Sequence, residues 1–378
     1  MPIMTGLSGN EMYCLHLKGF EPGELVIGNS VYAMGFVGTV GAGLKTIAGG
    51  EVSAVTQVIH DGREQALNRM LEEASHQNAI GITGVSNELI QRSGGIEFLS
   101  IGSCIHHEGA GRERVEFSTC ADGQELYCQL DAGFMPIKFV FGNVAYSIGL
   151  GGGIIGGFRS LMRGEVKEFS DVFNETRHRA LWRITEEARQ AKANAVVGIR
   201  TSILPFGGMQ EMVMIGTASR HRALPEEFYE SPITSDLTNE EMWNLVHMGY
   251  MPIQLVLGVS VYSVGFAGSV VAGFRSLVRG EIPEMTSLLY EARENAIKRI
   301  RADAELCGAD DVMGIKTYVY NLGSGIIEFM ALGTAVKKMP GIRTLTDALP
   351  PQAVIKDKDT FFNSAELNTA TNLNEFNG

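Results

Sequence analysis

The chain has little cysteine, and the cysteines are not spaced as a disulfide framework. Five occur in 378 residues, the number is odd, and no two are arranged as Cys-x-x-Cys. A small secreted protein held by disulfides carries an even, closely spaced set. Residues 1–10 also lack a basic region followed by an apolar run, so no signal peptide is expected. We therefore expect a reducing, cytoplasmic location.

Positive charge is scarce as well. The formal net charge is −12, with 31 Lys and Arg against 43 Asp and Glu, and no basic run stands out. A protein that binds nucleic acid needs a basic face to replace the counterions of the phosphates. Nucleic acid is therefore excluded as an expected partner, and an acidic membrane surface is disfavoured for the same reason.

The sequence contains an internal repeat. Gly28, Gly142 and Gly258 begin equivalent segments, at offsets of 114 (142 − 28) and 116 (258 − 142) residues. Repeated units of this length, in a chain that is 45% apolar, indicate tandem folded modules. We predict modules at 10–123, 124–237 and 238–338, and a polar tail with little core of its own at 339–378.

The pattern inside each unit predicts an α+β fold of β-α-β-β order. A short amphipathic helix comes first; in the third unit Thr238 or Asn239 would cap it, and Gly249 with Pro252 would end it. Apolar strands are expected at 25–33, 139–147 and 255–263, and long helices with one buried stripe at 53–77, 167–191 and 283–307. Two further strands complete a small antiparallel sheet of three strands with open edges.

Three stretches of the repeat carry a family resemblance. They are the apolar strand at 253–262, Gly-Phe-Arg-Ser-Leu-Val-Arg-Gly-Glu at 273–281, and the helix-to-strand segment at 291–315. Their order and spacing resemble the YbjQ-like family, also labelled a heavy-metal-binding domain family. The resemblance implies dodecin-like modules and ring-shaped oligomers, often pentameric, and no established chemistry. The first copy departs from it, with Leu-Lys-Thr-Ile-Ala-Gly-Gly-Glu at 44–51.

Two apolar stretches have competing interpretations. Residues 139–158 are 20 uncharged residues in a row, about the length of a membrane span, but seven are glycine, which favours a strand, a turn and a helix. A membrane-associated oligomer stays a lesser alternative. Gly151–Gly156 matches the Gly-x-Gly-x-x-Gly pattern of phosphate loops, yet the other copies lack it. Close packing of backbones at a subunit contact is favoured there, and no cofactor is expected.

Metal ligands and catalytic groups do not recur between the copies. The best local cluster is Cys104, His106 and His107, a weak metal-site candidate; an ordinary buried thiol beside surface histidines is the favoured interpretation. No Ser/His/Asp or Cys/His arrangement repeats, so we do not expect an enzyme.

One polar set does recur. Glu97 and its equivalents lie inside an apolar strand, where an ionised carboxylate needs a partner, and arginine is the side chain best shaped to supply one. The set either forms structural ion pairs or binds an anion or ligand at a module interface. As candidate interface residues it comprises Lys45, Arg159, Arg275, Glu51, Glu165, Glu281, Arg63, Arg177, Arg293, Glu97, Glu211 and Glu328.

These patterns favour a non-enzymatic protein that assembles with itself into a closed ring or shell and scaffolds or stores partners. The assembly would contain five chains, with one ring for each module level, or fewer chains in a pseudo-symmetric ring. The alternative is a protein that binds metal or a small ligand between its modules. An unknown protein partner or cargo could dock on the C-terminal tail through Phe361, Phe362 and Leu367.

Overall fold

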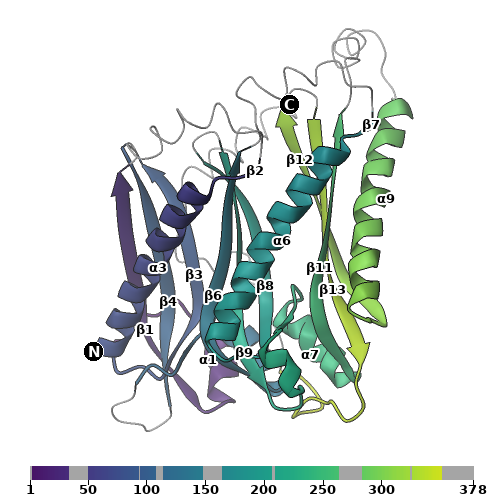
Figure 1. Cartoon of the computed structure of the whole chain (residues 1–378). Coiled ribbons are helices and arrows are strands. Elements are labelled where there is room, and N and C mark those ends of the chain that lie inside the picture. Colours follow the sequence, from purple (N-terminus) through teal and green to yellow (C-terminus); the bar gives the residue numbers. More distant parts are fainter. Residues whose placement is uncertain are drawn as a thin grey trace, which may run out of the picture.

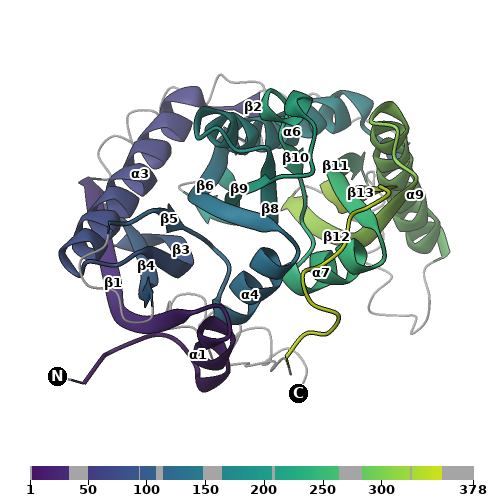
Figure 2. The same cartoon turned by 90° about the horizontal axis from the view of Figure 1, so that it is seen from below.

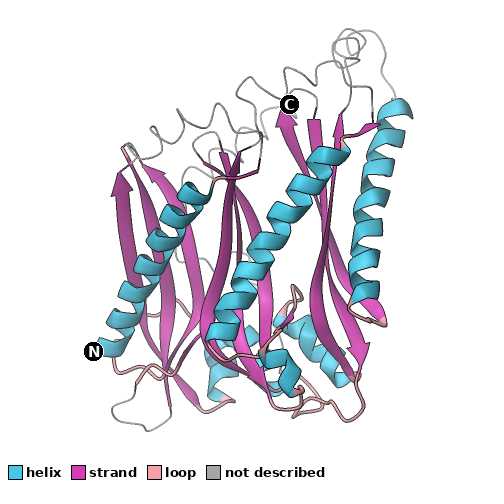
Figure 3. Cartoon of the chain, viewed as in Figure 1, coloured by secondary structure: helices cyan, strands magenta, loops and turns pink. Residues whose placement is uncertain are grey.

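The computed structural model describes residues 2–33, 50–92, 94–107, 114–147, 164–206, 209–263, 283–323 and 326–350. Within these ranges the chain forms three modules of the same order: a short helix, a long strand, a long helix and a hairpin (Figures 1 and 3). The predicted α+β fold is confirmed. The Gly-x-Gly-x-x-Gly segment and the last 28 residues (378 − 350), with Phe361, Phe362 and Leu367, lie outside the described residues.

The three modules contain matching elements. Module 1 has α1 (Gly9–His16), β1 (Phe20–Ala33), β2 (Gly50–Glu51), α3 (Ser53–His76), β3 (Gly81–Arg92) and β4 (Gly95–His107), and β5 (Phe117–Ser118) follows it. Module 2 has α4 (Gly123–Asp131), β6 (Phe134–Ser147), β7 (Gly164–Glu165), α6 (Lys167–Gln190), β8 (Ala195–Phe206) and β9 (Met209–His221), followed by η2 (Glu226–Tyr229) and β10 (Ile233–Thr234). Module 3 has α7 (Asn239–His247), β11 (Tyr250–Ser263), α9 (Pro283–Leu306), β12 (Asp311–Gly323) and β13 (Ile326–Lys338).

Neighbouring modules extend one another's sheets. The strand orders are β1-β4-β3-β5, β10-β8-β9-β6-β2 and β12-β13-β11-β7. The short strand β2 of module 1 pairs with β6 of module 2, and β7 of module 2 pairs with β11 of module 3. The linker strands β5 and β10 pair in parallel with β3 and β8. The prediction of three-stranded sheets is therefore wrong, because a short strand from the preceding module or from the linker pairs with one or both edges of each sheet.

The short helix and the first long strand meet at a repeated turn. Gly19, Gly133 and Gly249 have φ of +80°, +89° and +82°, a conformation that glycine adopts without strain. In module 3 the N-cap is Thr238, which forms a capping box with Glu241. The long strands begin five residues earlier than predicted, because a register shift after Pro22, Pro136 and Pro252 lets the ladder pass each proline.

The repeated glycine of each long strand lies directly under the long helix. A Cβ added at Gly28, Gly142 or Gly258 would lie 2.1–2.2 Å from the carbonyl oxygen of Ala66, Ala180 or Ala296. Only glycine permits so close an approach of helix and strand, which explains why this residue marks the repeat.

The modules lie side by side in a curved row. Seen from below, the long helices α3, α6 and α9 are spread along one side of the row, while α1, α4 and α7 gather on the other (Figure 2). Buried apolar clusters run across both module boundaries; one of them unites α6 and β9 with β11 and β13. In the described part of the chain, no helix is both long enough and apolar enough to cross a membrane.

The first part of the predicted tail is packed against the modules. Met339, Ile342 and Leu349 contact the cluster around α4 and α7, and Thr346 donates a hydrogen bond from Oγ1 to Asp131 Oδ2 (2.7 Å). Asp131 also accepts hydrogen bonds from Trp243 Nε1 (2.8 Å) and Lys18 Nζ (2.6 Å). One carboxylate thus connects α1's C-terminal side, α4, α7 and residues 339–350.

Candidate functional site: the interfaces between modules

A buried ion pair joins modules 1 and 2. Arg63 on α3 donates from Nη2 and Nε to the two carboxylate oxygens of Glu211 on β9, at 2.7 and 3.0 Å, and both side chains are completely buried. The third nitrogen, Nη1, donates to Asn87 (2.6 Å to its carbonyl oxygen, 3.0 Å to Oδ1). The two-pronged geometry is the one in which a guanidinium best compensates a buried carboxylate.

The same pair joins modules 2 and 3. Arg177 on α6 donates from Nη2 to both carboxylate oxygens of Glu328 on β13, at 2.8 and 2.9 Å, and both are completely buried. Burial alone would lower the pKa of Arg177, but the Glu328 carboxylate raises it above its usual value. Tyr146 accepts a further hydrogen bond from Arg177 Nη2 (2.5 Å), and its ring lies 4.1 Å from the guanidinium carbon. The arginine is therefore held charged at the boundary.

The short strands place a second carboxylate at each boundary. Glu51 on β2 accepts hydrogen bonds from Arg183 (2.6 Å) and Arg179 (2.9 Å) on α6 of the next module. Burial would raise the pKa of Glu51, but these hydrogen bonds lower it below its ordinary value. Glu165 on β7 lies 3.7 Å from Arg299 on α9 in the same way. Modules 1 and 2 thus each place a glutamate beside the long helix of the following module.

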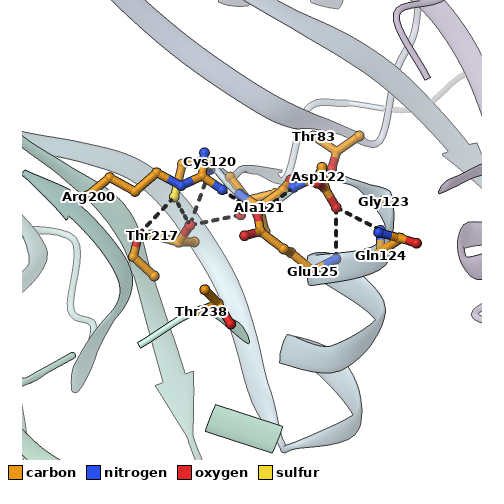
Figure 4. A network of polar contacts seen from close by, with 12 residues as sticks. Thr83, Cys120, Ala121, Asp122, Gly123, Gln124, Glu125, Arg200, Thr217 and Thr238 are labelled. Atoms are coloured by element: carbon orange, nitrogen blue, oxygen red, sulfur yellow. Dashed lines mark hydrogen bonds and ion pairs between the residues drawn. The ribbon is translucent and has the colours of Figure 1, made fainter. Parts of the chain in front are cut away.

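A third set of contacts lies in the linker between modules 1 and 2 (Figure 4). Thr119 and Thr217 share a hydrogen bond of 2.8 Å between their hydroxyl groups, and the Cys120 N–H donates to Thr217 Oγ1 (3.2 Å). Arg200 donates to Glu125 (2.5 Å), the glutamate of the α4 capping box. The network fixes the linker to the last strand of module 2 and to its first helix.

The second linker repeats this arrangement. Ser235 Oγ lies 3.3 Å from Thr334 Oγ1, and the Asp236 N–H donates to the same oxygen (3.1 Å). Burial raises the pKa of Asp236, whose Oδ2 lies 3.4 Å from Lys316 Nζ. A cavity of about 220 Å³ adjoins this linker, with Arg200 and Lys316 in its wall.

The strand hydroxyls that bind the linkers were not among the residues predicted from the sequence. Ser103, Thr217 and Thr334 each follow the glycine of the module's last strand, Gly102, Gly216 or Gly333. A buried hydroxyl at the same place in three apolar strands is a signal that the repeat could have revealed.

The weak metal candidates do not form a ligand set. Cys104 is buried, and burial raises the pKa of its thiol to about 12, which disfavours the thiolate that binds metal. The ring of His107 stacks on Phe20 with 5.5 Å between centroids. Among the residues that the structure describes, no three His, Cys, Asp or Glu side chains are grouped to hold a metal ion.

The candidate interface residues divide into three groups. Arg63 with Glu211, Arg177 with Glu328, and Glu51 and Glu165 lie at the boundaries between modules. Glu97 and Arg293 occupy the equivalent positions at the two ends of the row. Lys45, Arg159, Arg275 and Glu281 lie in ranges whose side chains are outside the described residues.

A comparison with protein-family models agrees with this three-module architecture. One family model, described as "Putative heavy-metal-binding" and named YbjQ, matches at residues 20–103, 135–222 and 250–339. The chain belongs to this family. The three matched segments coincide with the three modules, so the YbjQ-like resemblance is confirmed for each copy.

Individual relatives cover either one module or more than one. An encapsulin nanocompartment protein of Mycobacterium tuberculosis is 31% identical over 228 residues, which is 57% of this chain and 83% of the relative. A UPF0145 protein of Pseudothermotoga lettingae is 43% identical over 83 residues, 22% of this chain and 78% of the relative. A UPF0145 protein of Methanococcus maripaludis is 39% identical over 83 residues, 22% and 74% of the two chains.

Proposed function

We propose that this chain is a non-enzymatic, self-assembling protein whose copies form a closed ring or shell that scaffolds or stores partners. One observation carries the proposal: the boundary between modules 1 and 2 recurs between modules 2 and 3, with the same buried ion pair at equivalent positions. A cytoplasmic location, in keeping with five free thiols, is part of the same proposal.

A repeated head-to-tail contact has a geometric consequence. Such a contact generates a closed ring when its rotation closes, and a filament when it does not. The three modules already follow a curved row (Figure 2), which supports closure. Because the modules lie beside one another, the row supports the version in which a few chains close one pseudo-symmetric ring more than a stack of three five-chain rings. The encapsulin relative supports a shell.

The direct test is the assembly state of the full-length chain. Size-exclusion chromatography with light scattering and negative-stain electron microscopy at micromolar concentration should give discrete closed particles well above the monomer mass of 40.9 kDa. A monomer under these conditions would overturn the proposal. Native mass spectrometry of particles purified from their own cells then identifies a protein or small molecule held by them, including one docked on the C-terminal tail.

The alternative, a protein that binds metal or a small ligand between its modules, is supported by the cavity beside Asp236 and Lys316. Elemental analysis separates the two functions. Stoichiometric metal that is lost on Cys104→Ser or His106→Ala would favour the alternative. Discrete particles without metal or a bound small molecule favour the assembly function.

A further inference from the structure

The two ends of the row carry the separate halves of the boundary ion pair. Glu97 is equivalent to Glu211 (211 − 97 = 114), and Arg293 is equivalent to Arg177 (293 − 177 = 116). Arg293 is exposed, with its guanidinium carbon 5.7 Å from the centre of the Phe329 ring. Glu97 is bound instead by Arg92 of its own sheet, at 2.8 Å, and Arg92 is largely exposed. Module 1 thus carries the carboxylate of the boundary pair, and module 3 carries the arginine.

The outer face of β1 exposes two apolar side chains, Ile27 and Val31, on either side of Asn29. Ile27 and Val31 are 48% and 66% exposed. Their equivalents are Phe141 and Ala145 in module 2 and Leu257 and Val261 in module 3, and all four are buried against the preceding module (2%, 0%, 0% and 0% exposed). The same strand face is therefore covered twice within the described residues and left exposed in module 1.

The N-terminal segment contacts module 1 in the same way as the two linkers contact the modules that follow them. Its Gly6 N–H donates to Ser103 Oγ (3.2 Å), as Cys120 and Asp236 donate to Thr217 and Thr334. Residues 3 and 4 are then equivalent to the linker strand β5 (117 − 3 = 114). Ile3 and Met4 are 53% and 71% exposed, whereas Ile233 of β10 is completely buried.

Module 3 offers the matching strand edge. β10 pairs with Ala195 and Val196 at the start of β8. The equivalent residues of module 3 are Asp311 and Val312 (311 − 195 = 116), at the start of β12, which is the outer strand of its sheet. Ile315 on the same strand is 47% exposed, while its equivalents Val85 and Ile199 are buried.

We propose that module 1 of one copy docks on module 3 of a second copy and repeats the boundary found inside the chain. Arg293 of one copy pairs with Glu97 of the other, α9 covers the outer face of β1, and Ile3 and Met4 form a parallel strand beside Asp311 and Val312. The inference rests on the proposed function and specifies its joining contact. The contact is head-to-tail, so each copy uses both of its ends.

One side-chain pair makes the joining contact more sensitive to salt than the boundary between modules 2 and 3. At the boundary of modules 2 and 3, His178 Nε2 lies 3.2 Å from Asp303 Oδ2. The equivalent positions at the joint carry Glu294 and Glu73, two acidic residues. Their repulsion is screened at physiological salt, where the Debye length is about 8 Å. Assembly should therefore be weaker at low ionic strength.

Charge reversal tests the joint directly. Glu97→Arg alone and Arg293→Glu alone each place like charges at the joint, so each variant is expected to run as a monomer in light scattering. The double variant E97R/R293E restores a complementary pair at every joint and is expected to regain the wild-type particle mass. An equimolar mixture of the two single variants restores complementary pairs wherever the two alternate, so it is expected to give particles with an even number of chains. The control is Glu168→Arg on α6, because this side chain is exposed and takes part in none of the boundary contacts described above.

The outcomes separate this inference from the proposed function. A wild-type chain that is monomeric refutes the proposed function itself. Wild-type particles that survive both single reversals refute only the joint proposed here. Far-ultraviolet circular dichroism of each variant shows whether it is folded. Hydrogen–deuterium exchange supplies a second readout: residues 3–5 should exchange at least tenfold more slowly in the assembled wild type than in the monomeric variants, and equal exchange would overturn the strand pairing.

Discussion

The two inner boundaries of the chain share an ion pair but differ in what surrounds it. Asn143 of module 2 is buried against α3; its Nδ2 donates to Thr56 O (3.2 Å), and its Oδ1 has no hydrogen-bond partner. The equivalent residue of module 3 is Val259, which is buried in the cluster that unites modules 2 and 3. Around Asn143 the apolar contact is divided into two clusters. The Arg–Glu pair is therefore common to both boundaries, whereas the apolar packing around it differs between them.

The boundaries also differ in titratable side chains. At the second boundary His178 and Asp303 attract one another. At the first, the equivalent residues are Glu64 and Glu187, and burial raises the pKa of Glu187 to about 7, with Glu64 adding to the rise and Lys138 opposing it. At this position the first boundary therefore holds two acidic residues where the second holds a hydrogen-bonded pair.

Removal of the ion-pair arginines should have the largest effect. Arg63→Ala leaves Glu211 buried without a partner, which costs about 3–5 kcal/mol of unfolding free energy. Arg177→Ala should cost less, because Nη1 of Arg177 already lacks a hydrogen-bond partner while every nitrogen of the Arg63 side chain has one. Urea unfolding measures both. The exposed Arg92→Ala is the control, with an expected loss below about 1 kcal/mol; a similar loss for Arg63→Ala would contradict the prediction.

Truncation of a buried apolar side chain at the first boundary should cause the second-largest loss of stability. Phe141→Ala removes a buried ring between α3 and β6 and should cost about 3–4 kcal/mol, measured by the urea midpoint. Met135→Ala on the same strand is the control, because this side chain is about half exposed, and its loss should stay within about 0.5 kcal/mol. Equal losses for the two variants would show that the boundary is not a packed core.

Exchanging the residue types of Asn143 and Val259 should change the free energy of unfolding in opposite directions at the two boundaries. Val259→Asn introduces a buried amide at the second boundary and should cost about 1–3 kcal/mol. Asn143→Val removes a buried acceptor that has no partner and should raise the unfolding free energy by about 1 kcal/mol. Thermal unfolding by calorimetry measures both changes. A loss of stability in Asn143→Val would mean that the bond to Thr56 outweighs the unpaired oxygen.

The smallest effect concerns pH. The pKa of Glu187 rises from 4.5 to about 7 on folding, so the folded chain binds more protons in this window and loses stability as pH rises, by at most about 1.4 kcal/mol per pH unit. Burial would lower the pKa of His178, but its hydrogen bond with Asp303 raises it above 6.5. The stability that His178 contributes is complete below pH 6.5 and is lost as the pH rises through the pKa of His178 in the folded chain.

Two variants separate these contributions in urea titrations at several pH values. Glu187→Gln should flatten the profile between pH 4.5 and 7. His178→Gln should flatten it only from pH 6.5 upward. If both variants keep the wild-type slope throughout, neither group links the boundaries to pH.

Much of each module could be predicted from local sequence. The spacing of apolar residues predicted the long helices to within one residue at their ends, as in α6, because a helix that covers a sheet buries one face along its whole length. The recurring glycine at position 142 marked the repeat, and the structure shows why it recurs: α6 lies directly over it. The sequence also predicted that Glu211 needs an arginine, because a carboxylate inside an apolar strand must be compensated.

Only the tertiary structure decided which arginine meets which glutamate. Arg63 pairs with Glu211, 148 residues away, and not with Glu97 of its own module. Periodicity describes one helix or one strand at a time and cannot tell a partner in the same module from the identical position in the next. The choice depends on how one module's helix packs on the following sheet, a long-range arrangement held by buried apolar clusters that cross the boundary.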